Sequence, residues 1–198
     1  MPKFRRLMGI TILGLASACS AQTDTPETTP QYDAELAIMM PPSAPYEADA
    51  TATLIDRTGS DIGTAYFYQA TDGIIMRLAV QGLTPGIHGM HFHAAGTCED
   101  PQDGFMATGG HIMPLGKPHG YRHPEGPHAG NLPNLIVRAD GTAVIELHTH
   151  LVTVSGGTAA LLDENGSTLI IHENEDDHFT QPIGGAGGRV VCGVVTAP

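Results

Sequence analysis

The sequence predicts an all-β domain, an antiparallel β-barrel or sandwich with Greek-key connections. Short β-prone runs follow one another from residue 51 to the end of the chain, and turn residues separate them. No run shows the periodicity of a convincing amphipathic helix. The 25 glycines and 15 prolines suit many short strands joined by turns. Together, these three observations favour the all-β class.

Turn signals mark the boundaries of the expected strands. Asp140-Gly141 is a strong hairpin signal, and Asn165-Gly166 marks a further turn. The expected strands are residues 51–56, 63–69, 74–80, 135–139, 142–147, 159–162, 168–172 and 189–195, with one more just before residue 94. Two segments rich in Gly, Pro, His and Asp, 94–133 and 173–188, are predicted to be long loops. The first contains many potential metal ligands, which favours a functional role.

The N-terminal residues have the pattern of an export signal. Three cations precede an apolar run, 7–16, which is too short to span a bilayer because a span takes roughly 20 apolar residues. Small residues and then Cys19 predict cleavage after Ala18 and lipid attachment at Cys19, with simple cleavage and no lipid as the alternative. The predicted organisation is a signal peptide over 1–18, a lipidated cysteine with a flexible linker over 19–47, and a folded domain over 48–198.

The charge balance and the cysteines limit the environment and the partners. The formal net charge is −12, and removing residues 1–18 leaves 6 Lys and Arg against 21 acids. Such an acidic chain is not expected to bind nucleic acid, which needs a basic face. Cys98 and Cys192 form an even pair, which predicts a disulfide in an oxidising compartment. We therefore expect a periplasmic protein that contacts the membrane only through a lipid at Cys19.

Histidines are concentrated in one part of the chain. All 11 lie between His88 and His178, and seven of them fall within 88–128. His91 and His93 are two residues apart, so a strand would place both imidazoles on one face, a good start for a copper or zinc site. The alternative is a pair of partly exposed histidines on a polar strand face.

Further ligand candidates lie in the first loop and at the end of a later strand. His111, His119 and His128 sit beside glycines or prolines, which allow close backbone approach and hold a loop in a fixed shape. His172 ends the strand expected over 168–172 and is well placed to reach the pair at residues 91 and 93.

These motifs resemble those of a known family. The run 86–93, Gly-Ile-His-Gly-Met-His-Phe-His, resembles the copper-binding strand of the Cu,Zn superoxide dismutases, and the likeness covers roughly residues 50–195. It continues through Gly109-Gly110-His111, His119-Gly120, residues 128–133, Ile171-His172-Glu173 and residues 188–193, with the order and spacings kept. The resemblance, to exported bacterial lipoprotein members in particular, implies an eight-stranded antiparallel Greek-key β-barrel or sandwich with two long functional loops.

The resemblance also implies roles for individual residues. Arg189 would sit beside the copper and attract superoxide, and Asp176 would accept hydrogen bonds from one ligand of each metal. Cys98 and Cys192 would form the disulfide. Copper would be bound by His91, His93, His111 and His172, and zinc by His111, His119, His128 and the residue at 131, one ion of each kind per subunit.

One position departs from the family pattern. Asn131 stands where the fourth zinc ligand is expected to be an aspartate. An amide offers only a neutral carbonyl oxygen, which is a weaker donor than a carboxylate. We therefore expect weaker zinc retention with copper binding intact, unless Glu125 or another nearby acid takes the place of the missing carboxylate.

Several other charged and titratable residues are assigned smaller roles. His88 is expected to be structural, and Lys117 and Arg122 to help attract an anion to an otherwise acidic protein. Outside the motif are His123, His148, His150 and His178, for which a surface or structural role and a secondary metal site are both kept.

The resemblance implies an enzyme that converts superoxide to O₂ and hydrogen peroxide at a redox-cycling copper ion, with His111 and Arg189 as catalytic residues. The first alternative is a copper-binding or storage module of the same fold with little catalysis. The second is a structural or interaction domain that has lost its metals. The motifs do not report the oligomeric state, so a monomer and a homodimer are both kept.

Overall fold

The structure is a computed structural model, and it describes residues 47–198. The expected signal peptide, Cys19 and all but the last residue of the linker lie outside the described residues. Within 47–198, no helix is long and apolar enough to cross a membrane.

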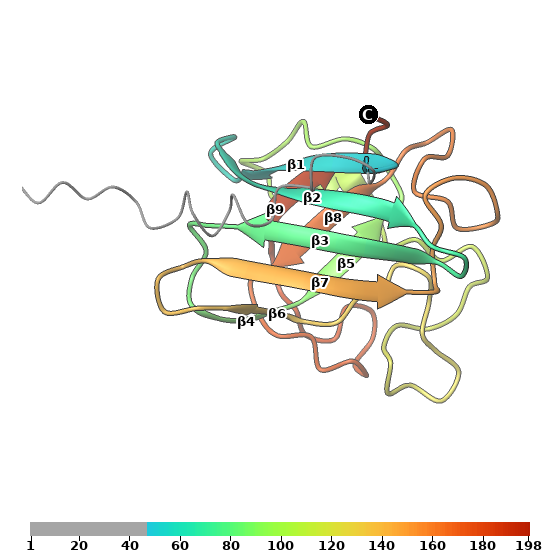
Figure 1. The fold of residues 1–198 in the computed structure, drawn as a ribbon. Helices are drawn as coiled ribbons and strands as arrows, with labels where there is room; N and C mark the ends of the chain where they lie inside the picture. Colours follow the sequence, from blue (N-terminus) through green and yellow to red (C-terminus); the bar gives the residue numbers. More distant parts are fainter. Residues whose placement is uncertain (1–46) are drawn as a thin grey trace, which may run out of the picture. The chain divides into compact units, whose positions relative to one another are not determined.

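The regular structure of the described residues is almost entirely β, as the sequence predicts (Figure 1). It comprises a single 3-10 helix, Met106–Thr108, and nine strands. The strands are β1 (Ala50–Asp56), β2 (Asp61–Gln69), β3 (Ile74–Val80), β4 (Gly86–His88), β5 (Met90–His93), β6 (Leu135–Val137), β7 (Ala143–Thr149), β8 (Thr168–His172) and β9 (Arg189–Val194).

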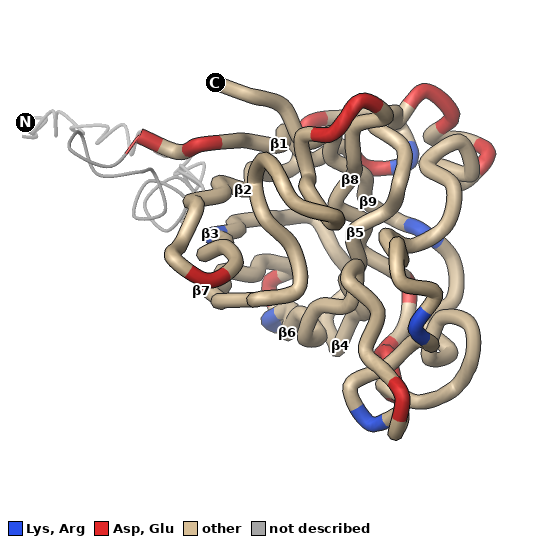
Figure 2. The backbone as a smooth tube through the Cα atoms, turned by 90° about the vertical axis from the view of Figure 1, so that its right-hand side faces the viewer, with Lys and Arg blue, Asp and Glu red and all other residues tan. Residues whose placement is uncertain are grey.

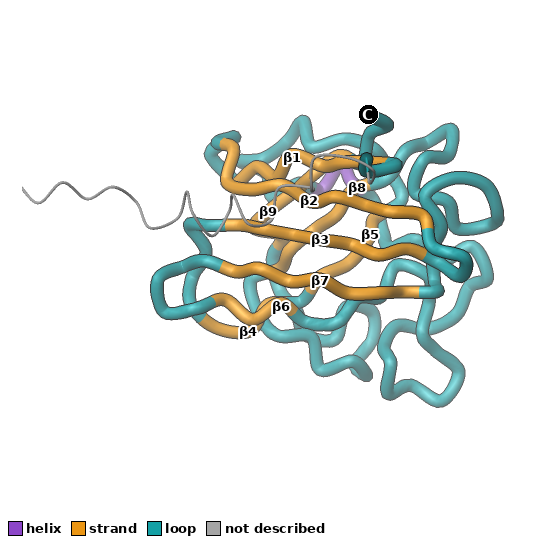
Figure 3. The backbone as a smooth tube through the Cα atoms, in the orientation of Figure 1, coloured by secondary structure: helices purple, strands orange, loops and turns teal. Residues whose placement is uncertain are grey.

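The strands form one large curled sheet and one small ribbon (Figure 3). The seven-stranded sheet has the order β5-β8-β9-β1-β2-β3-β7, and all of its pairs are antiparallel. β1 therefore lies between β2 and β9, the last strand of the chain, which is the crossover expected of a Greek key. β4 pairs with β6, β6 contacts β7, and β4 leads directly into β5, so the ribbon links the two edges of the large sheet.

Alternating side chains build the core. In β3, Ile74, Met76 and Leu78 are fully buried, whereas Ile75 and Arg77 between them are not. Phe67 of β2 and Phe92 of β5 meet inside the sandwich with ring centroids 5.9 Å apart. Since the side chains before and after Phe92 on β5 point the other way, the same strand faces the core and the histidine cluster.

The structure corrects two expectations about the strands. The expected single strand before residue 94 is broken at Gly89 into two strands, β4 and β5. Gly89 bonds through its backbone to the second loop, and a Cβ there would approach the side chain of Ala186 to 2.9 Å. Residues 159–162 form no strand and make only one isolated bridge, from Thr153 to Ala160. Their apolar side chains fill the core from a loop, and Leu161 is completely buried.

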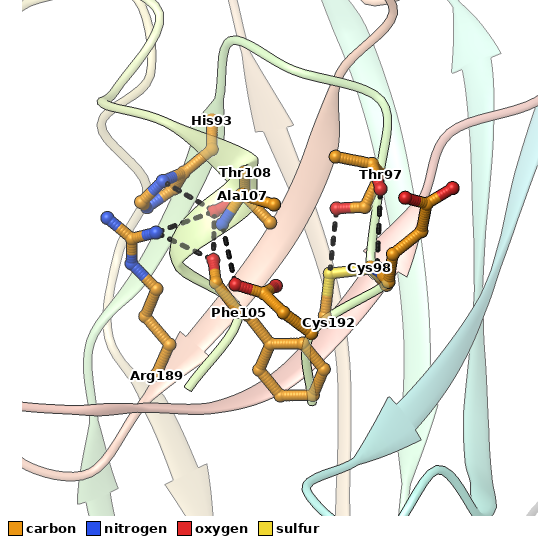
Figure 4. Close-up of a disulfide and its surroundings, with 10 residues drawn as sticks. His93, Thr97, Cys98, Phe105, Ala107, Thr108, Arg189 and Cys192 are labelled. Atoms are coloured by element: carbon orange, nitrogen blue, oxygen red, sulfur yellow. Dashed lines mark hydrogen bonds between the residues drawn. A yellow bond between two sulfur atoms is a disulfide. The ribbon is translucent and has the colours of Figure 1, made fainter. Parts of the chain in front are cut away.

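The expected disulfide is present and anchors the first long loop. Cys98 and Cys192 are bonded across a sequence separation of 94 residues, and Cys192 lies on β9 (Figure 4). Arg189, which begins β9, donates from Nη1 to the carbonyl of Phe105 and from Nη2 to the carbonyl of Gly109. The bridge and these bonds together hold the segment 98–109 against the first half of β9.

Candidate metal centre

The strand ends and the first loop bring the predicted histidines together. β5 carries His91 and His93, and β8, its neighbour in the sheet, ends at His172. The loop folds back onto β5 through isolated bridges that pair His93 with His111 and His91 with Asn131. The two-residue spacing on β5 turns both of its imidazoles to the same side, as expected.

The first cluster contains the four histidines expected to bind copper. All four are buried, and one nitrogen from each lies within 4.8 Å of the others. The members are His91, His93, His111 and His172.

Hydrogen bonds on the outer side of this cluster set the tautomers of three of its rings. His91 Nε2 donates to Asp176 Oδ2 at 2.9 Å, His93 Nδ1 to the Gly109 carbonyl at 3.0 Å, and His172 Nδ1 to the Gly187 carbonyl at 3.1 Å. Since a neutral imidazole carries one proton, the other nitrogen of each ring keeps a free lone pair.

Those free lone pairs point into the cluster. Four buried nitrogens have no hydrogen-bond partner among the described residues: His91 Nδ1, His93 Nε2, His111 Nε2 and His172 Nε2. Unpaired buried polar atoms are costly, so four in one cluster mark a place for a cation. Four imidazole nitrogens are a donor set that copper binds well, and this half of the centre therefore fits a copper ion.

Burial keeps the imidazoles neutral. It lowers the pKa of His172 to about 3, with help from the neighbouring His91, and it lowers the pKa values of His91 and His93 as well. The pKa of His111 lies far below its ordinary range because the ring is buried and other imidazoles surround it. Neutral imidazoles are the form that binds a metal ion.

The second cluster shares His111 with the first. His111 Nδ1 lies 2.8 Å from His128 Nε2, which lies 3.4 Å from His119 Nδ1. Burial and then the nearby His119 lower the pKa of His128 to about 4. Three nitrogens that face one another at these distances suit a shared cation, and three imidazoles are a sufficient start for zinc.

Asn131 does not complete this second cluster as a carboxylate would. Its side chain is fully buried, and its Oδ1 accepts a hydrogen bond from the Gly120 amide at 3.1 Å. This bond turns the amide nitrogen inward, so Nδ2 donates to His119 Nδ1 at 3.2 Å. The group that faces the three histidines is therefore an N–H₂ group, which has no lone pair to offer a metal. Among the described residues, this cluster therefore contains three imidazole nitrogens and no carboxylate oxygen.

Asp176 connects the two clusters. It is buried, with one oxygen bound to His91 and the other accepting from His119 Nε2 at 2.9 Å. Burial alone would raise the pKa of this carboxyl, but the hydrogen bonds from His119 and His91 outweigh burial and hold it far below its usual range. Gly184 has φ 61°, and a Cβ there would overlap the carboxylate, so the loop leaves room only for glycine.

Arg189 lies beside the first cluster. Its guanidinium bonds to the carbonyls of Phe105 and Gly109 and to Thr108 Oγ1 at 2.7 to 2.8 Å, next to the ring of His93 (Figure 4). It lines a cleft of about 370 Å³ together with His93 and His172. The positive charge of Arg189 is therefore held in place at this side of the cluster, partly exposed to solvent.

The three other charged residues named in the sequence analysis lie in different surroundings. Lys117 lines a neighbouring cleft with His111 and Arg189, whereas Arg122 turns its Nη1 to the carbonyl of Asp177. Glu125 is exposed and belongs to none of the ligand clusters found among residues 47–198.

The histidines outside the motif also have separate places. Both ring nitrogens of His88 bond to carbonyls, so His88 has none left for a metal. Neither His123, His148 nor His150 belongs to a ligand cluster within the described residues. Two contacts were not foreseen: His178 approaches Asp176 Oδ2 to 3.3 Å, and the side-chain amide of Asn134 bonds to the backbone of Asp176.

The all-β sandwich and its two adjoining clusters of buried imidazoles define the class of this protein: a β-sandwich metalloprotein with places for two neighbouring ions. Comparison with known proteins identifies the family. The family described as copper/zinc superoxide dismutase (SODC) matches residues 62–195. The chain therefore belongs to the copper/zinc superoxide dismutase family, which is named for the two metals that the clusters suit.

Relatives span most of the described domain. A Cu-Zn superoxide dismutase of Caulobacter vibrioides is 43% identical and covers 74% of this chain and 84% of its own. Superoxide dismutase [Cu-Zn] 1 of Aquifex aeolicus is 35% identical, covering 83% of this chain and 98% of its own. Among solved structures, a SOD-like protein from Bacillus subtilis matches with a TM-score of 0.69 at 36% identity, over 73% of this chain and 96% of that one. The Cu/Zn superoxide dismutase from Brucella abortus matches with a TM-score of 0.59 at 30% identity, over 73% and 98%.

Replacing Asp176 with Asn should weaken the binding of both metals. In the wild-type chain, both rings donate an N–H to the carboxylate of Asp176. An asparagine side chain would turn its N–H₂ toward one of the two rings, so His91 and His119 would lose their common acceptor. Loss of such an outer partner typically costs about 10- to 100-fold in metal affinity. Competition with a chromophoric chelator, performed with Cu²⁺ and with Zn²⁺, measures this. The matched control is Asp177→Asn, at an exposed neighbour whose side chain bonds, among the described residues, only to Phe179 and Thr180. Equal affinities of the two variants would contradict the expectation.

The metal-free protein should lose stability as the pH falls. The pKa is about 3 for His172 and about 4 for His128 in the folded chain, whereas an unfolded histidine titrates near pH 6.5. Between those values the unfolded chain binds more protons, so the free energy of unfolding rises with pH. The free energy of unfolding from urea denaturation should be at least about 1 kcal/mol lower at pH 5 than at pH 7.5. His150→Gln, an exposed histidine outside the clusters, should leave this difference unchanged; a pH-independent stability would count against neutral buried imidazoles.

Proposed function

We propose that this chain dismutates superoxide at a copper ion held by His91, His93, His111 and His172. The observation that carries the proposal is the convergence of four buried, unpartnered imidazole nitrogens beside the guanidinium of Arg189. Membership of the copper/zinc superoxide dismutase family supports the same reaction. Two superoxide ions and two protons give one O₂ and one hydrogen peroxide, so the reaction consumes no other reductant or oxidant.

The side chains have separate tasks in this reaction. Bound copper supplies the one-electron redox couple, which no side chain here provides. Arg189 offers a fixed cation to the incoming anion, since carbonyls of Phe105 and Gly109 hold its guanidinium in place. His111 Nε2 faces the first cluster while Nδ1 faces the second, so this ring is the one able to hold a proton at Nε2 and pass it to the departing peroxide.

We further propose that zinc occupies the second cluster and is held weakly. His111, His119 and His128 supply three nitrogens, and Asn131 presents its amide N–H₂ to His119 in place of an oxygen. The three-histidine set supports binding, and the missing carboxylate removes both a ligand and a negative charge beside the cation. The copper half has an outer partner of its own, because His91 donates to the buried Asp176, and this supports intact copper binding.

The organisation of the whole chain is also a proposal. We propose that residues 1–18 direct export, that Cys19 carries a lipid, that 19–47 is a linker and that 48–198 is the catalytic domain in the periplasm. The disulfide between Cys98 and Cys192 supports an oxidising compartment, because such bridges persist outside the reducing cytosol.

The first test measures metal content and superoxide consumption on the same sample. Copper-loaded protein should consume superoxide, and His93→Ala, which removes one of the four nitrogens, should lower that activity by at least about 100-fold relative to the parent. His148→Ala, on β7 and outside the clusters, is the matched control. A protein that binds one copper ion tightly but consumes no superoxide would instead be a copper-binding module, the second candidate; the name of a 38% identical relative in Bacillus subtilis, superoxide dismutase-like protein YojM, keeps that candidate in view.

The second test restores a carboxylate in the zinc cluster. Asn131→Asp should accept the Gly120 amide with one oxygen and offer the other to the metal, so zinc should bind about tenfold or more tightly. Competition with a chromophoric chelator measures the affinity, and Co²⁺ absorption reports the number of ligands. Asn165→Asp, on an exposed turn, adds the same charge and should change neither. Stoichiometric zinc that resists chelators in the unmodified chain would contradict weak retention.

A further inference from the structure

A second arginine, Arg57, lies at the cleft that leads to the first cluster. It belongs to the turn between β1 and β2, remote in sequence from every motif histidine. It lines the cleft of about 370 Å³ that also contains His93, His172 and Arg189. We propose that Arg57 is the outer cation of the superoxide entry path, which draws the anion into the cleft that Arg189 occupies. This inference rests on the proposed function.

The loop anchored by the disulfide positions both guanidinium groups. Arg57 Nη2 donates to the carbonyl of Gln102 at 3.0 Å, and a Cβ on Gly104 would lie 3.7 Å from the same nitrogen. Arg189 Nη1 donates to the carbonyl of Phe105 at 2.7 Å. Carbonyls only three residues apart in one segment thus hold the two cations, so both face the same cleft in a fixed relation.

The charge balance makes these cations important. Acidic residues spread over the described chain, while Lys and Arg are few (Figure 2). Three of the nine Lys and Arg residues lie within the expected signal peptide, which leaves six for the domain. Half of those six line the entrance: Arg57 and Arg189 share one cleft, and Lys117 and Arg189 share the adjoining one. A local group of cations is what an acidic protein needs to attract an anion.

The other charged residues either oppose the anion or are bonded elsewhere. Asp103 lines the same cleft as Arg57 and opposes an incoming anion. Arg77 is paired with Glu146 on another face, and Arg122 bonds to a carbonyl in the second loop. Among the described residues, Arg57 forms no ion pair with a carboxylate, and its guanidinium donates to the carbonyl of Gln102, so its charge is not neutralised by a salt bridge.

The test is the ionic-strength dependence of kcat/KM for superoxide in the copper-loaded full chain. Removing one unit charge several ångströms from the path of an anion in a solvated cleft should slow capture roughly two- to threefold at low salt. Arg57→Gln should show this loss, Arg57→Lys should retain most of the rate, and Asp103→Asn should raise it. Since salt screens exposed charges, the variants should converge with the parent near 0.5 M salt.

Arg122→Gln is the matched control, because it removes the same charge from an exposed position outside the cleft. A second readout is the dissociation constant of azide, measured by optical titration of the bound copper, which should rise about twofold in Arg57→Gln and remain unchanged in Arg122→Gln. Identical salt slopes and azide affinities in these two variants would overturn the role of Arg57. If the parent consumed no superoxide, the proposed function would fail, and the azide titration alone would decide whether Arg57 attracts anions into the cleft.

Discussion

The arrangement of the metal centre depends on one buried carboxylate. Asp176 lies on the second long loop, yet its two oxygens bind His91 of β5 and His119 of the first loop. These bonds fix which nitrogen of each ring carries the proton and hence which nitrogen points inward. Because one carboxylate bonds to a histidine of each cluster, it fixes the positions of β5, the first loop and the second loop relative to one another. The asparagine and histidine contacts around Asp176 hold it in turn.

The two clusters, which share His111, differ in how the chain holds their side chains. The first cluster takes its ligands from rigid strands and from a loop tied to β9 by a disulfide, and its unpartnered nitrogens all converge. The three histidines of the second cluster all lie in the first loop, beside Asn131, whose amide donates a hydrogen bond to His119 where an aspartate would offer an oxygen. The neutral amide of Asn131 has hydrogen-bond partners at both its oxygen and its nitrogen in the folded chain. The two ions are therefore expected to differ in how firmly the protein holds them.

The acidic surface and the anionic substrate pose a physical conflict that local structure resolves. The overall field of a chain with formal charge −12 repels superoxide, and distant charges are screened in solution. The charges that remain effective are those held beside the path of the anion. In our proposal these are the charges of Arg189 and Arg57. Backbone carbonyls of the segment 98–109 hold both guanidinium groups, so no carboxylate is needed to position them and, within residues 47–198, none neutralises their charge. The disulfide thus serves the entrance of the site as well as the stability of the domain.

The sequence by itself determined the all-β class, the two long loops, the histidine ligand candidates and the unusual Asn131, because strand alternation, turn residues and ligand spacing are local properties. It missed the break at Gly89, the loop that replaces a strand at 159–162, and Arg57. Each of these depends on a contact between distant segments: Gly89 on the second loop, Leu161 on the core, and Arg57 on Gln102. Likewise, only the folded chain decided that Asn131 turns its N–H₂ toward His119, since the Gly120 amide that orients it becomes a neighbour only when the loop closes.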